Sequence, residues 1–222
     1  MNRLILRHGY VITAVIALIF AWVIYRRIST GSGIRTLAIT ALIVWVCGTS
    51  AFVVLWPRMV VTGFKRAALG PGGFGGHPIP VNTLYAEPGT ASASASNASL
   101  MGTGTDHLIY LGGWIDLSAG PQVLRVPDTA GRYYNVQLTE PSGGTNFAYI
   151  GKRTTGTAAG AYALTGPGWT GTLPDGVAQV PSPSHGVLAI GRVYLAGDHD
   201  QPAAYALAEQ FRLTPLSSHG TI

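Results

Sequence analysis

Residues 133–151 read YYNVQLTEPSGGTNFAYIG, and this stretch decides the fold class. Polar and apolar side chains alternate from Tyr133 to Leu138, as they do in a strand that buries one face. Pro-Ser-Gly-Gly at 141–144 interrupts the run, and a second run rich in aromatic and branched residues follows at 146–150. Turn residues between two such runs predict a pair of β-strands.

Similar short runs continue on both sides of this pair, with Gly- and Pro-rich turns between them. We expect strands at 107–114, 122–126, 133–139, 146–150, 161–164 and 187–195. Strands at this spacing favour a β-sandwich over residues 107–222. One short helix is expected at 202–210, with Asp200 as its N-cap. The predicted fold class is therefore mainly β, a sandwich domain that follows two N-terminal transmembrane α-helices.

The transmembrane prediction rests on two apolar runs, at 9–25 and 36–56. Apolar residues make up 47% of the chain and charged residues 10%, where a soluble domain carries about 25% charged residues. About 20 apolar residues are needed to cross a bilayer, and the second run has this length. The first run lacks a small-x-small cleavage site, so we interpret it as a retained span and residues 1–66 as a two-helix membrane anchor.

Basic residues concentrate in this anchor, which has eight of them and no acidic residue. Positive charge that flanks apolar runs is typical of a membrane protein, and no nucleic acid is expected as a partner. We predict a two-span protein of the plasma (inner) membrane. Five basic residues in the outer flanks against three in the loop favour both ends inside, whereas the denser cluster of Arg26, Arg27 and Arg35 before the second span favours a C-terminal domain outside the cytoplasm, which is the orientation that we adopt. Thr13, Ala17 and Ala21 recur at a spacing that lets another helix pack closely, although alanine is common in such spans.

Between the anchor and the sandwich, residues 67–106 are rich in Gly, Pro and Ser. Such a composition buries too little apolar surface to offset the entropy of ordering. We therefore expect an approach and insertion loop over this whole range.

A basic, hydroxyl-rich loop at 151–157 (GKRTTGT) is the main candidate for ligand binding. Cations, hydroxyls and backbone amides near glycines suit a phosphate or carboxylate, whereas the alternative is a hairpin turn with solvated charges. The candidate ligand-binding residues are Asp128, Tyr134, Asn146, Lys152, Arg153, Thr154, Thr155 and Arg192. No catalytic constellation is evident. We expect neither a metal nor another cofactor, because the histidines are not paired at metal-ligand spacings and there is one cysteine.

Several motifs in this order resemble the family called domain of unknown function 1254. The motifs occupy residues 82–85, 113–121, 126–134, 145–157, 166–169, 191–192 and 213–216. The resemblance implies an immunoglobulin-like β-sandwich, usually on exported or membrane-anchored bacterial proteins, and here in a single-domain version. The resemblance also implies an Asp at the position of Asn82 in most relatives. We do not expect the jelly-roll domain that often follows in the family.

These observations favour a membrane-anchored accessory or binding subunit of a bacterial cell-envelope membrane protein complex. Its partners would be the lipid bilayer and other integral membrane subunits or further copies of the chain. One alternative is a cell-envelope enzyme, hydrolytic or metal-dependent, that uses the Lys152–Thr157 loop. A second alternative is a self-assembling structural envelope protein.

Overall fold

The computed structural model describes residues 18–19, 21–23, 25–26, 29, 33–71, 78–90 and 107–216. The chain forms two compact units, Met1–Phe64 and Lys65–Ile222. Most of the predicted span at 9–25 lies outside the described residues, as do Thr13 and Ala17, while Ala21 lies in a helical turn and is exposed. The two-span arrangement and the helix-packing stripe therefore stay predictions.

Helix α2, Ile34–Leu69, is a continuous helix of 36 residues that contains the whole predicted span at 36–56. Its most apolar part has no buried residue, and by length and composition it suits either a membrane span or a signal sequence. The helix continues through Ala67, Ala68 and Leu69, which we expected to belong to the loop. Alanine and leucine favour helix, so the chain leaves the helix only at Gly70 and Pro71.

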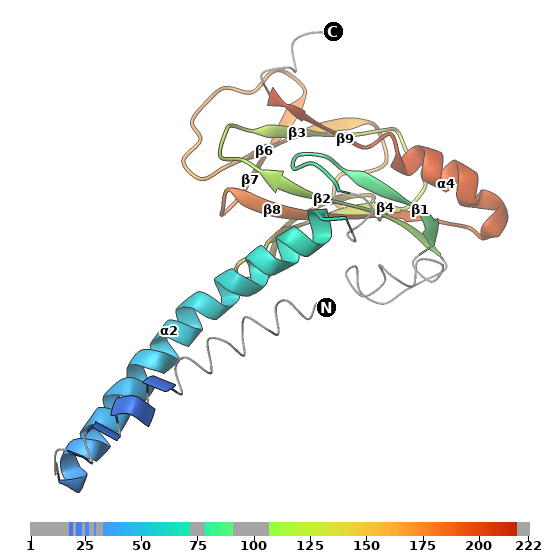
Figure 1. Cartoon of the computed structure of the whole chain (residues 1–222). Helices are drawn as coiled ribbons and strands as arrows, with labels where there is room; N and C mark the ends of the chain where they lie inside the picture. Colours follow the sequence, from blue (N-terminus) through green and yellow to red (C-terminus); the bar gives the residue numbers. More distant parts are fainter. Residues whose placement is uncertain are drawn as a thin grey trace. The chain divides into compact units, whose positions relative to one another are not determined.

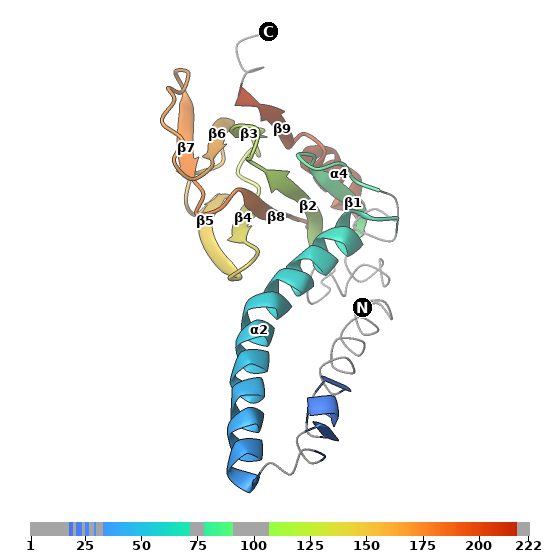
Figure 2. The same ribbon diagram turned by 60° about the vertical axis from the view of Figure 1, so that its left-hand side comes forward.

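The C-terminal unit is mainly β and contains two sheets, as Figure 1 shows. The five-stranded sheet has the order β1-β2-β8-β4-β5, and the four-stranded sheet has the order β7-β6-β3-β9 (Figure 2). The strands are β1 Tyr85–Thr90, β2 Leu108–Asp116, β3 Gln122–Val126, β4 Tyr134–Glu140, β5 Thr145–Gly151, β6 Gly160–Thr165, β7 Val177–Pro181, β8 Gly186–Tyr194 and β9 Arg212–Pro215.

One hydrophobic core joins the two sheets. The alternation in the deciding stretch is confirmed, because Val136 and Leu138 of β4 are fully buried and Gln137 between them is not. Leu124 of β3 and Leu164 of β6 enter the same core from the four-stranded sheet. The two sheets thus face each other across shared apolar side chains, while the immunoglobulin-like connectivity stays a prediction.

Three strands lie outside the predicted set: β1, β7 and β9. The whole of strand β1, Tyr85–Thr90, lies in the 67–106 range that we expected to be loop, and it pairs with β2 through an irregular register. Strand β7 reads VAQVP without alternation and has no buried residue, and β9 has only four residues. Each of these strands lies at a sheet edge, where tertiary pairing rather than hydrophobic alternation decides the conformation.

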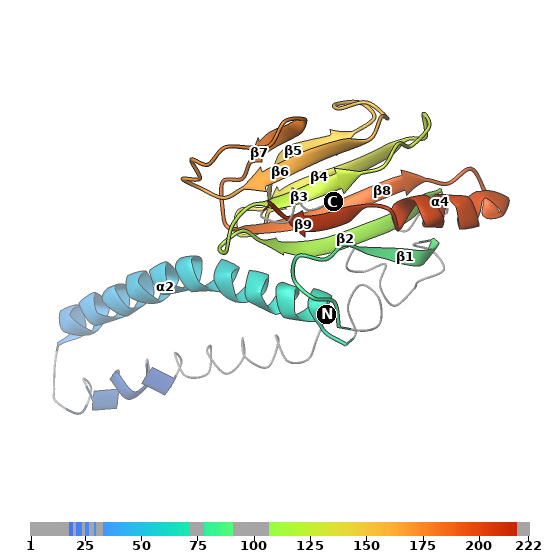
Figure 3. The same cartoon turned by 90° about the horizontal axis from the view of Figure 1, so that it is seen from above.

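Helix α4, Gln201–Ala208, follows the 3-10 turn η1, Asp198–Asp200, and contains most of the predicted helix. Ala204 and Ala208 are buried in the core, and the helix packs against β1, β2 and β8 (Figure 3). Asp200 stands at the N-cap position, but its side chain makes no capping hydrogen bond. The predicted position of the N-cap is therefore confirmed, but the predicted capping hydrogen bond is wrong, because this carboxylate binds an arginine instead.

Candidate functional site

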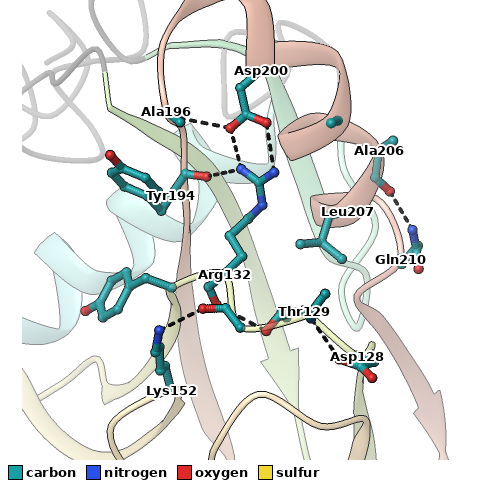
Figure 4. A pocket seen from close by; sticks show the side chains of 14 residues that line it. Asp128, Thr129, Arg132, Lys152, Tyr194, Ala196, Asp200, Ala206, Leu207 and Gln210 are labelled. Atoms are coloured by element: carbon teal, nitrogen blue, oxygen red, sulfur yellow. Dashed lines mark hydrogen bonds and ion pairs between the residues drawn. The ribbon is translucent and has the colours of Figure 1, made fainter.

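An open groove of about 820 Å³ lies where α4, the end of β8 and the 128–133 turn meet. We call it the edge groove, and Figure 4 shows its lining. Of the predicted ligand-binding residues, Asp128 and Lys152 line it. Arg132, Asp200 and Tyr194 contribute further polar atoms.

An ion pair between Arg132 and Asp200 dominates the edge groove. Arg132 donates from Nη1 to Asp200 Oδ2 at 2.5 Å and from Nη2 to Oδ1 at 2.8 Å, and Nη1 also donates to the Tyr194 carbonyl at 2.8 Å. Asp200 Oδ2 accepts the Ala196 amide at 2.9 Å as well. Hydrogen bonding to Arg132 holds the pKa of the Asp200 carboxyl well below its usual range and raises the pKa of Arg132. This pair fastens the start of α4 to the turn.

The turn itself uses its own polar groups. The Asp128 carboxylate accepts the Ala130 amide at 2.8 Å, and Lys152 Nζ donates to the Gly131 carbonyl at 2.7 Å. Ala130 and Gly131 both have positive φ, at 49° and 82°, which a local side-chain contact helps to hold. Both predicted residues in the edge groove are thus engaged in maintaining the turn.

In the basic loop, two threonine hydroxyls bind backbone groups of the same hairpin. Thr154 Oγ1 donates to the Tyr149 carbonyl at 2.8 Å, and Thr155 Oγ1 accepts the Gly151 amide at 3.1 Å. The Arg153 guanidinium lies 5.5 Å from the centre of the Tyr133 ring. The hydroxyls of these two threonines are therefore used in the hairpin rather than pointed at a ligand.

Tyr134, another predicted site residue, faces the core and is almost fully buried. Its hydroxyl lies 3.3 Å from Thr155 Oγ1, and burial raises the pKa of its phenol. It packs against Phe211 with ring centres 5.6 Å apart. Tyr134 thus acts as a core residue that also anchors the loop.

The remaining predicted residues, Asn146 and Arg192, lie together on the outer face of the five-stranded sheet. The strand register places Arg192 beside Asn135 and Tyr110, and Asn146 beside Thr139, on the same side of the sheet. The residues of this sheet-face cluster are Asn135, Gln137, Thr139, Asn146 and Arg192.

Gln137 connects the two ends of the sheet-face cluster. Its Oε1 accepts from Arg192 Nη1 at 3.3 Å, and its Nε2 donates to Asn146 Oδ1 at 2.9 Å. Thr139 Oγ1 donates to the same Asn146 oxygen at 2.7 Å. We did not select Gln137 from the sequence, although its polar position between inward-facing Val136 and Leu138 is the signal that places it on the outer face.

The described residues contain no group of three or more His, Cys, Asp and Glu side chains suited to a metal ion. The cluster at 198–200 has one carboxylate engaged with Arg132, and the sheet-face cluster offers amides, a hydroxyl and a guanidinium. The polar groups of these two clusters suit hydrogen bonding and charge recognition.

The sequence model of one family, described as protein of unknown function (DUF1254), matches residues 81–215. The chain belongs to the DUF1254 family. The match spans the strands of both sheets, the edge groove and the sheet-face cluster, and it confirms the resemblance seen in the motifs. No curated protein matches the chain.

Two solved structures are similar to part of the chain. The VPA0106 protein from Vibrio parahaemolyticus is 30% identical with a TM-score of 0.48, over 51% of this chain and 29% of that protein. A putative uncharacterized protein from Burkholderia cenocepacia is 15% identical with a TM-score of 0.38, over 62% of this chain and 36% of that protein. The chain thus spans about a third of the length of the solved proteins that it matches.

Asn82 is where this DUF1254 chain departs from the acid that we expect in relatives. Its Oδ1 accepts the Asp116 amide at 2.7 Å, and its Nδ2 donates to the Asp116 carbonyl at 3.2 Å. Its φ of 62° is one that asparagine tolerates better than most residues. Both ends of the amide therefore bind the end of β2, which is a structural role.

Proposed function

We propose that this DUF1254 protein is a membrane-tethered accessory or binding subunit of a cell-envelope complex, and that α2 is a membrane span. The observation that carries the proposal is the exposed apolar surface of α2. The exposed large side chains at its centre are Ile39, Leu42, Ile43, Trp45, Val46, Phe52, Val53, Val54, Leu55 and Trp56.

The energetic argument is that such a surface does not persist in water. Full exposure of one such side chain costs about 1.5–3 kcal/mol. The ten are 38–65% exposed, so together they still rival the whole net stability of a domain, about 5–15 kcal/mol. At about 1.5 Å per residue, residues 36–56 span roughly the 30 Å of a bilayer core. Arg58, Lys65 and Arg66 follow in the same helix, where basic side chains can reach the headgroups.

The proposal also includes another span, an orientation in the membrane and a binding role. Residues 9–25 form the first span, and Arg26, Arg27 and Arg35 then place the short connection in the cytoplasm. The two sheets, with an immunoglobulin-like connectivity, then lie outside the inner membrane. A binding role is supported by the sheet-face cluster, in which N–H groups of Arg192 and Asn146 have no acceptor among the described residues.

Extraction of membranes with alkaline carbonate tests the tether. The full chain should stay in the membrane pellet, and its mature N-terminus, read by mass spectrometry, should precede residue 34. Val46→Arg places a charge near the middle of the span, at a cost of about 2.5–3.5 kcal/mol, and should reduce retention. Val81→Arg, at an exposed site in the β unit, is the matched control and should not.

Release of the wild-type chain by carbonate would exclude the tether. Removal of α2 from the mature protein would also exclude it and would identify α2 as part of a signal sequence. Protease treatment of intact spheroplasts should digest the β unit, which tests the orientation. Purification in mild detergent should recover a membrane partner in fixed stoichiometry. Recovery of copies of this chain alone would favour the self-assembling alternative.

A further inference from the structure

We propose that the sheet-face cluster is a binding site for the carboxylate group of a small organic acid, with Arg192 as the primary contact. This proposal does not depend on the membrane tether, since every residue involved belongs to β2, β4, β5 and β8 of the C-terminal unit. It separates Arg192 and Asn146 from the Lys152–Thr157 loop with which we first grouped them.

The first argument is the unbalanced charge of Arg192. Its guanidinium makes one long hydrogen bond, 3.3 Å to Gln137 Oε1, and lies 5.6 Å from the centre of the Tyr110 ring. Among the described residues it has no carboxylate partner. Asn135, directly across in the register, keeps a buried Oδ1 that accepts no hydrogen bond from any described residue, so Arg192 does not use even this neighbouring acceptor.

The second argument is that the side-chain amide of Asn146 is oriented to donate. Asn146 Oδ1 accepts from both Gln137 and Thr139, which fixes the amide and leaves Asn146 Nδ2 without an acceptor among the described residues. Gln137 links this amide to Arg192 through its own Oε1. The face therefore presents donors at both ends of one hydrogen-bonded chain, and an anionic oxygen group is the complementary ligand.

The third argument is the aromatic side chains beside these donors. Tyr149 of β5 and Tyr194 of β8 are 43% and 44% exposed. The register puts Tyr149 beside Gln137, and Tyr194 lies two residues beyond Arg192, so both rings are on the outer face. Exposed tyrosines supply apolar contact area for the carbon skeleton of a ligand.

A carboxylate fits this site better than a phosphate. One guanidinium forks onto two carboxylate oxygens, whereas phosphate sites usually combine several cations or a run of backbone amides. The sheet-face cluster has one cation, and the backbone amides of β4 and β8 are used in the sheet ladder. A shallow site of this kind is expected to bind with a dissociation constant of roughly 1 mM.

Calorimetric titration of the detergent-solubilised full chain at constant ionic strength tests the assignment. The probe is glutarate, with neutral glutaramide and inorganic phosphate as comparison ligands. Glutarate should bind, glutaramide should not, and phosphate should bind at least about tenfold more weakly. Arg192→Gln should weaken glutarate binding at least about tenfold. Arg153→Gln is the matched control, because Arg153 lies over an aromatic ring at nearly the same distance but in the basic loop.

Should Arg192→Gln not fold, as judged by near-ultraviolet circular dichroism, Arg192→Lys replaces it. This variant keeps the charge but loses the fork, and it should weaken glutarate more than phosphate. Loss of binding in Arg153→Gln but not at position 192 would move the site to the basic loop and overturn the proposal. Equal binding of phosphate, or no binding of glutarate to the wild type at about 20 mM, would overturn it as well.

Discussion

Two arginines that lie near the same end of β8 have opposite surroundings. Arg132 in the edge groove binds both oxygens of Asp200 and the Tyr194 carbonyl. Arg192 in the sheet-face cluster makes one long bond to an amide and is otherwise stacked over Tyr110. A cation whose N–H groups are bound within the protein joins structural elements, whereas one with unused N–H groups is available to a ligand. If shape alone were considered, the edge groove would be chosen as the ligand-binding site, because it is concave.

The largest expected effect is on stability, and it separates the two arginines. Arg132→Gln should lower the free energy of unfolding by about 2 kcal/mol, because charged hydrogen bonds are lost and Asp200 loses its arginine partner. Arg192→Gln should lower it by less than about 1 kcal/mol. Urea unfolding of the solubilised chain, followed by near-ultraviolet circular dichroism, measures both. Equal losses would show that Arg192 is as structural as Arg132.

The second expected effect is a difference in acid sensitivity. The pKa of Asp200 is lower in the folded protein than the usual value near 3.9 of an unfolded chain. The stabilisation from this carboxylate is therefore complete above about pH 4 and decreases as the pH falls further. Asp200→Asn, which is less stable at neutral pH, should lose less additional stability than the wild type between about pH 5 and 3. Thermal unfolding midpoints at each pH measure this.

If the wild type and Asp200→Asn lose stability in parallel between about pH 5 and 3, another carboxylate controls the acid transition. Asp116 is the second carboxylate to compare with Asp200, since hydrogen bonds from Ser118 also lower its pKa. Asp116→Asn is the matching variant, and it changes a carboxylate that has no arginine partner among the described contacts.

The outcome for the fold shows which kinds of information a local pattern carries. The alternation of β4 predicts its inward face, and the continuous apolar run predicts a helix over 36–56. Strand β1 and the contact between Arg132 and Asp200 join residues far apart in the sequence, so no local pattern contains them. For the candidate site, residue type suggested Arg192 and Asn146 but not their separation from Lys152, because that depends on which face of the sheet each residue occupies.

Two asparagines, Asn82 and Asn146, allow the same comparison for side-chain amides. The third expected effect is the loss of stability in Asn82→Asp. Both ends of its amide bind Asp116, so Asn82→Asp loses the donor and sets a carboxylate against a carbonyl oxygen. We expect a loss of about 1 kcal/mol at neutral pH, measured by urea unfolding. The loss should shrink below about pH 4, where a protonated carboxyl regains a donor. A loss that is independent of pH would attribute the effect to the strained turn instead.

Asn146 gives the smallest expected effect on stability and the sharpest test of the sheet face. Asn146→Asp keeps an oxygen that accepts from Gln137 and Thr139, so the free energy of unfolding should change by less than about 0.5 kcal/mol. The new charge lies in the same hydrogen-bonded chain as Arg192 and competes with an incoming carboxylate. Glutarate should therefore bind several-fold more weakly, and Asn146→Ser, which adds no charge, should fall between the variant and the wild type. An unchanged glutarate affinity in Asn146→Asp would show that the ligand does not contact β5. The binding site would then include Arg192 but not the Asn146 amide.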